Sequence, residues 1–315
     1  MPIAHAPRRG SLQYWPRKRA KRSYARIKSW SKLDSTKLLA FIGYKVGMTH
    51  IIAKDNTPTS MTKNLNISTP VTIIECPPLK PLSLRFYKQS HDGLKVICDV
   101  YSSKLDKELK RKIKIQKIKK EIPEKFDDVR LRVYTQPKLT TVGKKKPEIL
   151  EIAVSGPKDK KLEFLKPFLE KEIKLQDVFK ENQFLDIHAI TIGKGYQGSR
   201  KRFGLALRSH KSAKTKRGPG SLGPWQPKKV RHTVPQAGQM GYHQRTEYNK
   251  QLFKILNKPE LVNPSGGWKH YGLVKNDYII VKGSVQGPSK RTIIMVEPRR
   301  VLRKLQNLEI ISIKK

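Results

Sequence analysis

The sequence predicts an α+β fold that is mainly β, with a β-barrel at its centre, an α/β insertion and long basic extensions. Three observations predict it. Short runs rich in β-branched and aromatic residues are separated by Gly, Pro and Asn-Asp turns. A stretch with helical periodicity interrupts these runs. Two long segments contain Lys and Arg but no Asp or Glu.

The β-rich runs lie on both sides of the interrupting stretch. Five precede it (KLLAFIGYK, THIIAK, PVTIIEC, SLRFYK and LKVICDVY) and three follow it (LDIHAITI, DYIIVKG and RTIIMVEP). An interrupted series of short strands is typical of a barrel whose excursions arise from the loops between strands. We therefore assign residues 34–100 to the first part of a barrel, 183–199 to a further strand with its turn, and 248–315 to the final part.

Residues 101–182 form the predicted α/β insertion. Fourteen of the 25 acidic residues of the chain lie there, among many lysines. Leu105, Leu109 and Ile113 share one helical face, the runs VRLRVYT and ILEIAV are strand-like, and a second helix is expected near LEFLKPFLEKEIKLQDVF. The lysines of this region fit a solvated helix face and an RNA contact equally well.

The charge distribution indicates a polyanionic partner. Lys and Arg number 68 against 25 Asp and Glu, a net charge of +43, which is far more than solubility requires. Residues 1–33, a predicted amino-terminal arm, hold ten Lys or Arg and no acid, and residues 187–246 hold thirteen and no acid. The arm and a long basic loop predicted at 200–247 lack the apolar surface for cores of their own. We expect each to become ordered on RNA.

Several other classes of function are excluded by the sequence. No apolar run approaches the roughly 18 residues of a membrane-spanning helix, and no apolar signal-peptide core follows the basic amino terminus. We therefore expect a cytoplasmic protein without a membrane partner. No GxSxG motif occurs, and the basic segments contain no paired carboxylates. The expected protein is not an enzyme and uses no metal, cofactor or small-molecule substrate.

The segment GKGYQG matches a dinucleotide-binding pattern, but its surroundings do not. Gly193, Gly195 and Gly198 follow a predicted strand, as the pattern requires. That pattern also needs an apolar helix at the third glycine and an acidic residue about 20 positions later. Here SRKRFG follows, and no acid occurs before Glu247. The glycines can instead let the backbone approach a phosphate chain or form a simple strand-exit turn, and these two uses are compatible.

The residues expected to contact RNA come almost entirely from the two acid-free segments. Arg and Lys bind phosphates, and aromatic rings stack on unpaired bases. The candidates are Arg8, Arg9, Trp15, Arg17, Lys18, Arg19, Lys21, Arg22, Arg26, Lys194, Arg200, Lys201, Arg202, Arg208, His210, Lys211, Lys214, Lys216, Arg217, Trp225, Lys228, Lys229, Arg231, His232 and Arg245. For Trp225 a local apolar plug is the alternative, and for His210 and His232 a local hydrogen bond. Trp30 and Trp268 fit core or rim packing at least as well.

One set of residues resembles the signature of a known family. The fixed positions of that signature are matched, at the same spacing, by Phe179, Asp186, Ala189, Thr191, Gly193, Lys194, Gly195, Gly198 and Arg202. The chain resembles the universal large-subunit ribosomal protein L-three family at these positions. HAPRRGSLQYWPRKRAKR is similar to the arm of archaeal and eukaryotic members, FIGYKVGMTH to the first barrel hairpin, and GSLGPWQPKKVRHTVPQAGQMGYHQRTEYNK to the central loop. The length and the GPW form of the loop resemble the archaeal type.

The resemblance implies a fold and a function. The implied fold is a translation-protein-type β-barrel of six to eight strands, with two extensions that penetrate rRNA. The implied function is that of a structural constituent of the large (50S) ribosomal subunit, which binds near the 3′ end of 23S rRNA and nucleates assembly. The loop tip that carries the position of Trp225 is expected to approach the peptidyl transferase centre. Large-subunit proteins of families fourteen and twenty-four-e are the implied neighbours.

Overall fold

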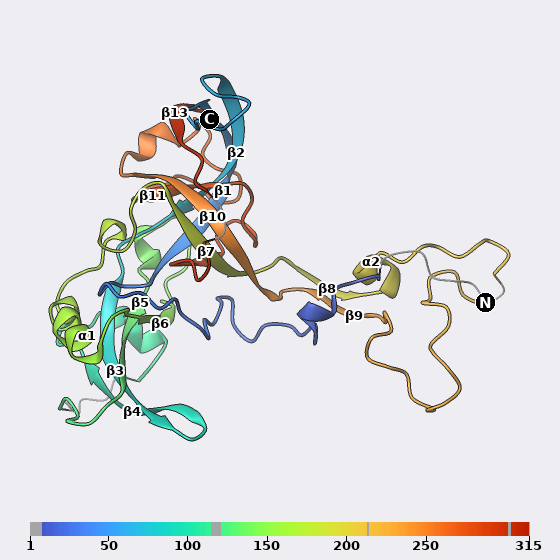
Figure 1. Ribbon diagram of the computed structural model, residues 1–315, viewed down its shortest axis with the longest axis horizontal. Coiled ribbons are helices and arrows are strands. Elements are labelled where there is room, and N and C mark those ends of the chain that lie inside the picture. The colour runs from blue at the N-terminus through green and yellow to red at the C-terminus, as the bar shows by residue number, and fades with distance from the viewer. Residues whose placement is uncertain (1–7, 115–120, 213, 302–303, 315) are drawn as a thin grey trace. The chain divides into compact units, whose positions relative to one another are not determined.

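The computed structural model describes residues 8–114, 121–212, 214–301 and 304–314, and within them the protein is mainly β (Figure 1). The strands are β1 (Ala40–Asp55), β2 (Asn66–Glu75), β3 (Lys80–Ser90), β4 (Gly93–Tyr101), β5 (Asp128–Tyr134), β6 (Ile149–Ala153), β7 (Gln183–Ile190), β8 (Gly193–Gln197), β9 (Gly238–Gly241), β10 (Gln244–Leu256), β11 (Tyr278–Lys282), β12 (Thr292–Val296) and β13 (Leu308–Ile313). The α-helices are α1 (Lys158–Leu165) and α2 (Ser199–Phe203). Short 3₁₀ helices span Leu12–Tyr14, Lys107–Arg111, Pro137–Leu139, Pro167–Leu169, Leu175–Asp177 and Pro259–Leu261.

The chain divides into two compact units. Unit 1 consists of Met1–Arg22 and Ile190–Gln244, and unit 2 of Ser23–Ala189 and Arg245–Lys315. Unit 1 thus combines most of the predicted arm with the predicted long loop. Unit 2 contains the two large sheets. No helix in the described parts of either unit has the length and apolar character needed to cross a membrane.

The larger sheet of unit 2 has seven strands in the order β12-β7-β10-β11-β2-β1-β13. Strand β1 pairs a second time, with β12, over the register Ala40↔Val296 to Tyr44↔Thr292. Hydrogen bonding therefore passes through six strands and returns to the strand where it began. The two predicted strands KLLAFIGYK and THIIAK form one long strand, β1, whose second half pairs with β13. Strand β1 is sixteen residues long and pairs with β12, β2 and β13 along different parts of its length.

Apolar side chains from the strands form two main core clusters in unit 2. The first contains Phe41, Phe179 and Ile294, each at most 1% exposed. Tyr24 and Ala25 are also buried in it, so the second half of the predicted arm packs into unit 2. Residues 23–33 of the predicted arm therefore contribute side chains to the core of unit 2, although the arm was not expected to have a core of its own. Trp30 packs at the rim of the first cluster and Trp268 at the rim of the second, which is the alternative to RNA contact that the sequence left open for both tryptophans.

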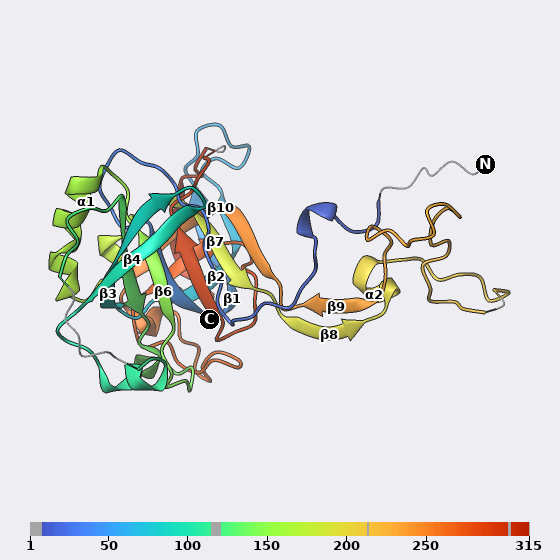
Figure 2. The same ribbon diagram turned by 90° about the horizontal axis from the view of Figure 1, so that it is seen from below.

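A second sheet in unit 2 has the order β4-β3-β5-β6, and α1 lies beside it (Figure 2). The sequence predicted β3 and β4 as strands but assigned them to the barrel. The structure instead pairs β3 with β5, over the register Lys80↔Tyr134 to Tyr87↔Asp128. The assignment failed because apolar alternation identifies a strand and its buried face, but not its neighbour in a sheet.

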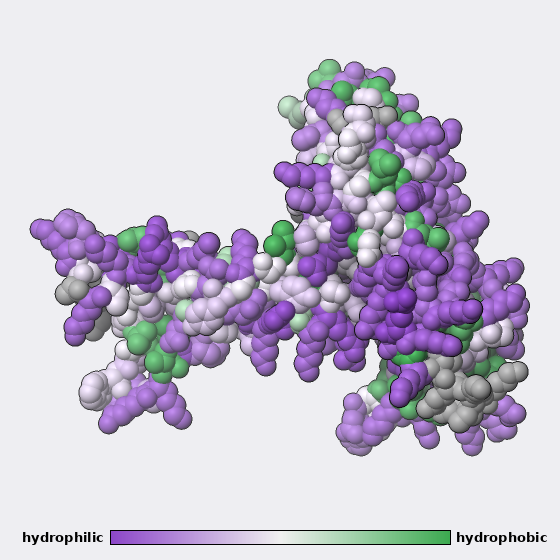
Figure 3. All heavy atoms as spheres, turned by 180° about the vertical axis from the view of Figure 1, so that it is seen from behind, coloured by the Kyte–Doolittle hydropathy of each residue, from purple (hydrophilic) through white to green (hydrophobic). Residues whose placement is uncertain are grey.

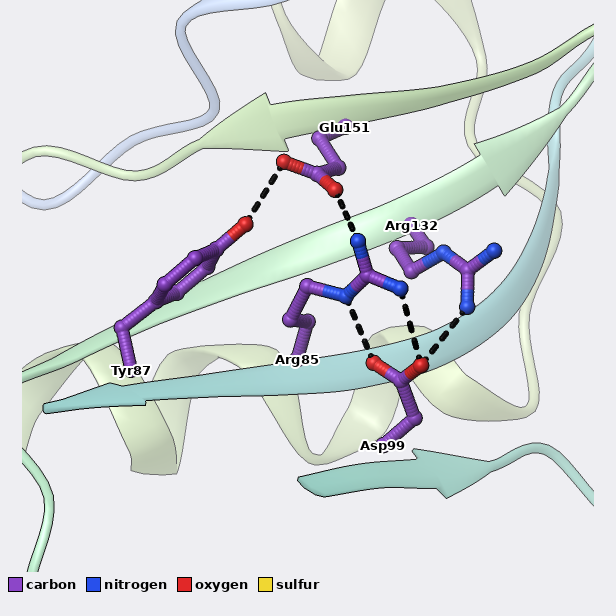
Figure 4. A network of polar contacts seen from close by, with 5 residues as sticks. All are labelled: Arg85, Tyr87, Asp99, Arg132 and Glu151. Atoms are coloured by element: carbon purple, nitrogen blue, oxygen red, sulfur yellow. Dashed lines mark hydrogen bonds and ion pairs between the residues drawn. The ribbon is translucent and has the colours of Figure 1, made fainter. Parts of the chain in front are cut away.

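One face of the second sheet carries a network of charges (Figure 4). Arg85 donates two hydrogen bonds to the Asp99 carboxylate, of 2.7 and 2.9 Å, and Arg132 donates a third of 2.8 Å. Arg85 also pairs with Glu151, which accepts a 2.7 Å hydrogen bond from the Tyr87 hydroxyl. Burial and the bond to Glu151 raise the pKa of Tyr87 to about 12. Asp99 and Glu151 are therefore paired with arginines of the same sheet.

The helices predicted for the insertion are shorter than expected. In the first, the described residues form only the 3₁₀ helix Lys107–Arg111, and residues 115–120 lie outside the described residues. Asp106 precedes this helix but does not cap it, because its carboxylate binds Lys80 and the Tyr134 hydroxyl at 3.0 Å each. Leu109 is fully buried in a cluster with Leu82 and Tyr134, and Leu105 and Ile113 pack against this cluster, so the predicted apolar face of the helix contacts the sheet. The second region forms α1 and two 3₁₀ helices.

Candidate nucleic-acid interface

Unit 1 is organised by a two-stranded ribbon. Strand β8 pairs with β9 through Gly193↔Gly241, Tyr196↔Gln239 and Gln197↔Gly238. Helix α2 follows β8 and ends at Gly204, which adopts the left-handed conformation (φ 69°) that favours glycine. The crossing at the base of the ribbon is tight, because a Cβ atom at Gly241 would lie 2.1 Å from the Ile192 carbonyl oxygen.

The arm packs on the loop through aromatic rings. Trp15 stacks on Phe203 with ring centroids 6.1 Å apart, and His232 meets Trp15 edge-on at 5.7 Å. The Arg17 guanidinium carbon lies 4.3 Å from the centroid of the Phe203 ring. A Cβ atom at Gly10 would come within 2.5 Å of that ring, and Phe203 is only 6% exposed. Neither segment contains a core by itself, but together they bury the Phe203 ring.

Arginine side chains tie the loop together at its base. Arg202 donates to the carbonyl oxygens of Gln239 (3.0 Å) and Gln236 (2.9 Å), and Arg17 donates to the Arg202 carbonyl (3.2 Å). Burial lowers the pKa of Arg202, while the nearby Tyr196 acts in the opposite direction. The guanidinium groups of Arg17 and Arg202 therefore hold the unit together.

His243 joins the arm to the end of the loop and is 8% exposed. The Gly241 amide donates to its Nε2 at 3.1 Å, so Nε2 is the accepting nitrogen. The proton then belongs to Nδ1, which donates to the Lys18 carbonyl at 2.9 Å. The Ala20 amide donates to the Tyr242 carbonyl at 2.9 Å and extends this contact by one backbone bond.

The structure gathers almost all the predicted contact residues in unit 1. The exposed ones are Arg8, Arg9, Lys18, Arg19, Lys21, Arg22, Arg26, Lys194, Arg200, Lys201, Arg208, His210, Lys211, Lys214, Lys216, Arg217, Trp225, Lys228, Lys229, Arg231 and His232. Trp15, Arg17, Arg202 and Arg245 are half-buried. Only Arg26 and Arg245 belong to unit 2.

Unit 1 carries a single sign of charge. It contains nineteen Lys or Arg residues and no Asp or Glu. Figure 3 shows hydrophilic residues over most of its visible face, with apolar residues at separate points. Because unit 1 has no carboxylate side chain, none of its cationic side chains can form an internal Asp or Glu ion pair. Their mutual repulsion can be relieved only by anions from outside the unit.

Trp225 lies near the middle of the loop and is 82% exposed. The ammonium of Lys228 is 6.0 Å from the centroid of its ring. Its neighbours Leu222 and Val230 are exposed by 46% and 49%, so they form no pocket for it. This exposure excludes the local apolar plug and leaves the ring available to a partner.

Two aromatic residues of unit 1 were missed by sequence reasoning. Phe203 is buried between the arm and the loop, and no local pattern predicts that a phenylalanine in SRKRFG meets a distant tryptophan. Tyr196 is 77% exposed on β8. Its signal was available, because it is the single aromatic residue of the GKGYQG motif. In the parts of the chain that the structure describes, no group of three or more His, Cys, Asp or Glu could hold a metal ion.

Comparison with known proteins identifies the family. The family model described as Ribosomal protein L3 matches residues 1–127 and 114–314. The chain belongs to the ribosomal protein L3 family. The large ribosomal subunit protein uL3 of Methanocaldococcus jannaschii is 44% identical, over 97% of this chain and 96% of that protein. The uL3 protein of Methanosphaera stadtmanae is 48% identical, over 92% of this chain and 91% of its own length.

Family membership decides the main alternatives left by the sequence. The resemblance to this family is confirmed, and the two similar proteins named above are archaeal, as the arm and loop indicated. The ribosomal protein L3 family consists of structural ribosomal proteins, so the chain is not an enzyme and the dinucleotide-binding interpretation of GKGYQG is rejected. The matches include both segments of unit 1.

Proposed function

We propose that the protein is a structural constituent of the large (50S) ribosomal subunit and that unit 1 is its main rRNA-binding element. The observation that carries this proposal is the charge of unit 1, with nineteen cationic residues, no acid, and most of the cationic side chains exposed. Lys and Arg on phosphates supply most of the affinity of a protein for RNA. As a component of the large ribosomal subunit, the protein is cytoplasmic, and its partners are 23S rRNA and neighbouring ribosomal proteins.

The finer assignments rest on the family. We propose that the chain binds near the 3′ end of 23S rRNA, acts early in subunit assembly, and contacts proteins of families fourteen and twenty-four-e. The loop would bring Trp225 toward the peptidyl transferase centre without supplying catalytic groups. The exposure of Trp225 and the Gly and Pro residues on both sides of it support this role, since such a sequence favours an extended chain.

The same proposal assigns a structural role to each segment of the chain. The six-strand circuit of the larger sheet would be the translation-protein-type barrel, because β12 pairs again with β1. The insertion would begin with the second sheet at β3 and run to residue 182, residues 1–22 would be the arm, and residues 200–247 the loop that enters rRNA. The contact of Trp15 with Phe203 supports the arm and loop entering the RNA as one element.

Co-sedimentation with purified rRNA tests the function. The full chain is mixed with protein-free 23S rRNA, 16S rRNA and random duplex DNA, each in a separate sucrose gradient at raised salt. We expect co-migration with 23S rRNA and protection of a region near its 3′ end from hydroxyl radicals. Equal co-migration with all three nucleic acids would indicate a general DNA- or RNA-compacting protein and contradict the proposal.

A further inference from the structure

Tyr196 is a large aromatic side chain that the protein leaves uncovered. It lies on β8, opposite Gln239 of β9, and is 77% exposed. Tyr242, which directly follows β9, has a different environment. Gly193 lies against the Tyr242 ring, where a Cβ atom would sit 3.5 Å from Tyr242 Cβ and 3.6 Å from the nearest ring carbon, and the Arg19 guanidinium carbon is 5.5 Å from the ring centroid. The Tyr242 ring is thus in contact with other residues of unit 1, whereas the Tyr196 ring is exposed.

The backbone beside Tyr196 is also uncovered. Gly195 has φ +68°, and the β8–β9 register shifts between Gly193 and Tyr196, so glycine is required there by conformation. Gly198 has an ordinary φ of −63°, and no heavy atom lies within 4 Å of a Cβ placed on it. Gly198 is the N-cap residue of α2, a position where glycine is common, and it is neither strained nor crowded within the chain. Its missing side chain keeps the backbone open to an external group.

The turn between these glycines is held in place by the protein. The Gln197 side-chain amide donates to the Lys194 carbonyl at 2.6 Å. Arg202, four residues after Gly198, donates hydrogen bonds to the carbonyl oxygens of Gln236 and Gln239. A fixed turn costs little ordering entropy when a ligand binds to it, which is a property of a preorganised contact.

Cationic residues lie on both sides of the exposed ring and open backbone in the sequence. Lys194, Arg200 and Lys201 are exposed within five residues of Tyr196. Unit 1 contains no acidic side chain to neutralise them. An exposed aromatic ring and an approachable backbone in a segment rich in exposed cations fit one chemical unit, a nucleotide with a planar base and an anionic phosphate.

We propose that Tyr196 is a base-stacking residue. An unpaired rRNA nucleotide lays its base on the Tyr196 ring, and the adjoining phosphate lies along the backbone of residues 195–198, near Lys194. This proposal rests on the rRNA-binding function and adds a second aromatic contact, separate from Trp225. A ring that stacks on any base carries no sequence code, so its contribution is to affinity and to the placement of one nucleotide.

Equilibrium binding of the full chain to 23S rRNA tests the proposal with three substitutions at one position. Tyr196→Phe keeps the ring, Tyr196→Leu keeps apolar bulk without a ring, and Tyr196→Ala removes both. We expect Phe to bind within about twofold of the original protein, and Ala and Leu to bind about 5- to 100-fold more weakly. The salt dependence should stay unchanged in all three, because no charge is lost.

Two controls make the result specific. Tyr248→Ala removes another exposed tyrosine (55%), on β10 in unit 2, and should leave affinity within about twofold. Lys194→Ala should instead lower the magnitude of the log–log salt slope by about 0.7–0.9, the value for one phosphate contact.

The outcomes separate this proposal from the function on which it rests. If the original protein fails to bind 23S rRNA selectively, the proposed function is wrong. If it binds, but Tyr196→Ala binds equally well, only the stacking proposal is overturned. Binding by Tyr196→Leu as tight as by Tyr196→Phe also overturns stacking, because it shows a general apolar contact such as a protein partner makes. Should Tyr196→Ala lose its structure, the comparison of Phe with Leu still decides.

Discussion

Trp15 of the arm lies almost parallel to Phe203 of the loop, with ring centroids 6.1 Å apart and 21° between the ring planes. The contact joins segments that are far apart in the sequence and that each carry only cationic charge. Both are parts of unit 1. This apolar contact opposes their electrostatic repulsion, together with the backbone bond between Ala20 and Tyr242 and the side-chain bonds of Arg17 and His243.

Removal of the Phe203 ring should separate the arm from the loop. We expect Phe203→Ala to lose about 1–3 kcal/mol of local stability, less than a fully buried core phenylalanine, because the cluster is small. Amide hydrogen exchange of Ala20 should accelerate by at least tenfold, while exchange in β12 stays unchanged. Leu222→Ala, at an exposed position, is the matched control. Unchanged exchange at Ala20 would show that the rings do not hold the arm.

Trp225 and Trp268 should respond in opposite ways to substitution by alanine. Trp225 is 82% exposed, so Trp225→Ala should leave the melting temperature unchanged and weaken a stacking contact by about 1–3 kcal/mol. Trp268 packs over Gly47, where a Cβ atom would lie 2.6 Å from the indole ring, so Trp268→Ala should behave as a packing mutant. Melting both variants and assaying ribosomes that carry each makes the comparison. Equal losses of melting temperature would assign Trp225 to the protein core.

The Asp99 carboxylate should make unit 2 sensitive to acid. Burial raises its pKa, but the hydrogen bonds and charges of Arg85 and Arg132 outweigh that effect and lower it below the ordinary value. A depressed carboxylate pKa stabilises the fold above the unfolded pKa of about 4, and this contribution is lost as pH falls through the folded pKa. Asp99→Asn should cost about 1–3 kcal/mol at pH 7 and progressively less below about pH 4. Urea unfolding of both proteins at pH 7 and at low pH measures this, and a pH-independent difference would contradict it.

The buried Glu75 carboxylate should be essential to the larger sheet. It is fully buried and accepts bonds from the Tyr271 hydroxyl, the amides of Lys275 and Asn276, and the Asn276 side chain. Glu75→Ala leaves these donors without an acceptor and should cost about 3–5 kcal/mol. Tyr271→Phe removes a single donor and should cost about 1 kcal/mol. Denaturant unfolding ranks the two, and equal costs would show that the carboxylate does not organise the group.

The strands were largely predictable from the sequence, but their partners were not. Runs such as PVTIIEC and RTIIMVEP carry enough β-branched residues to identify β2 and β12. Strand β10 was placed partly in the loop, because its first seven residues are polar and none of them is buried. Strands β3 and β4 were assigned to the wrong sheet, since alternation along one strand contains no information about the strand beside it.

The candidate interface was predictable in composition and not in geometry. Acid-free segments identified the cationic residues, and the exposure of Lys194 and Trp225 agrees with a contact role. The sequence did not show that Arg17 and Arg202 bind carbonyl groups of the protein itself. Such pairings depend on which distant segments meet, and charge alone does not specify that.

The salt dependence of binding to 23S rRNA tests the central claim most directly. At least about ten phosphate contacts from unit 1 predict a slope of about −7 to −9 for log K against log salt concentration. Single alanine substitutions at exposed cations of unit 1 should each reduce its magnitude by about 0.7–0.9, whereas substitutions in the Arg85 network of unit 2 should not. A shallow slope, or equal affinity for random duplex DNA at raised salt, would contradict an rRNA-binding role for unit 1.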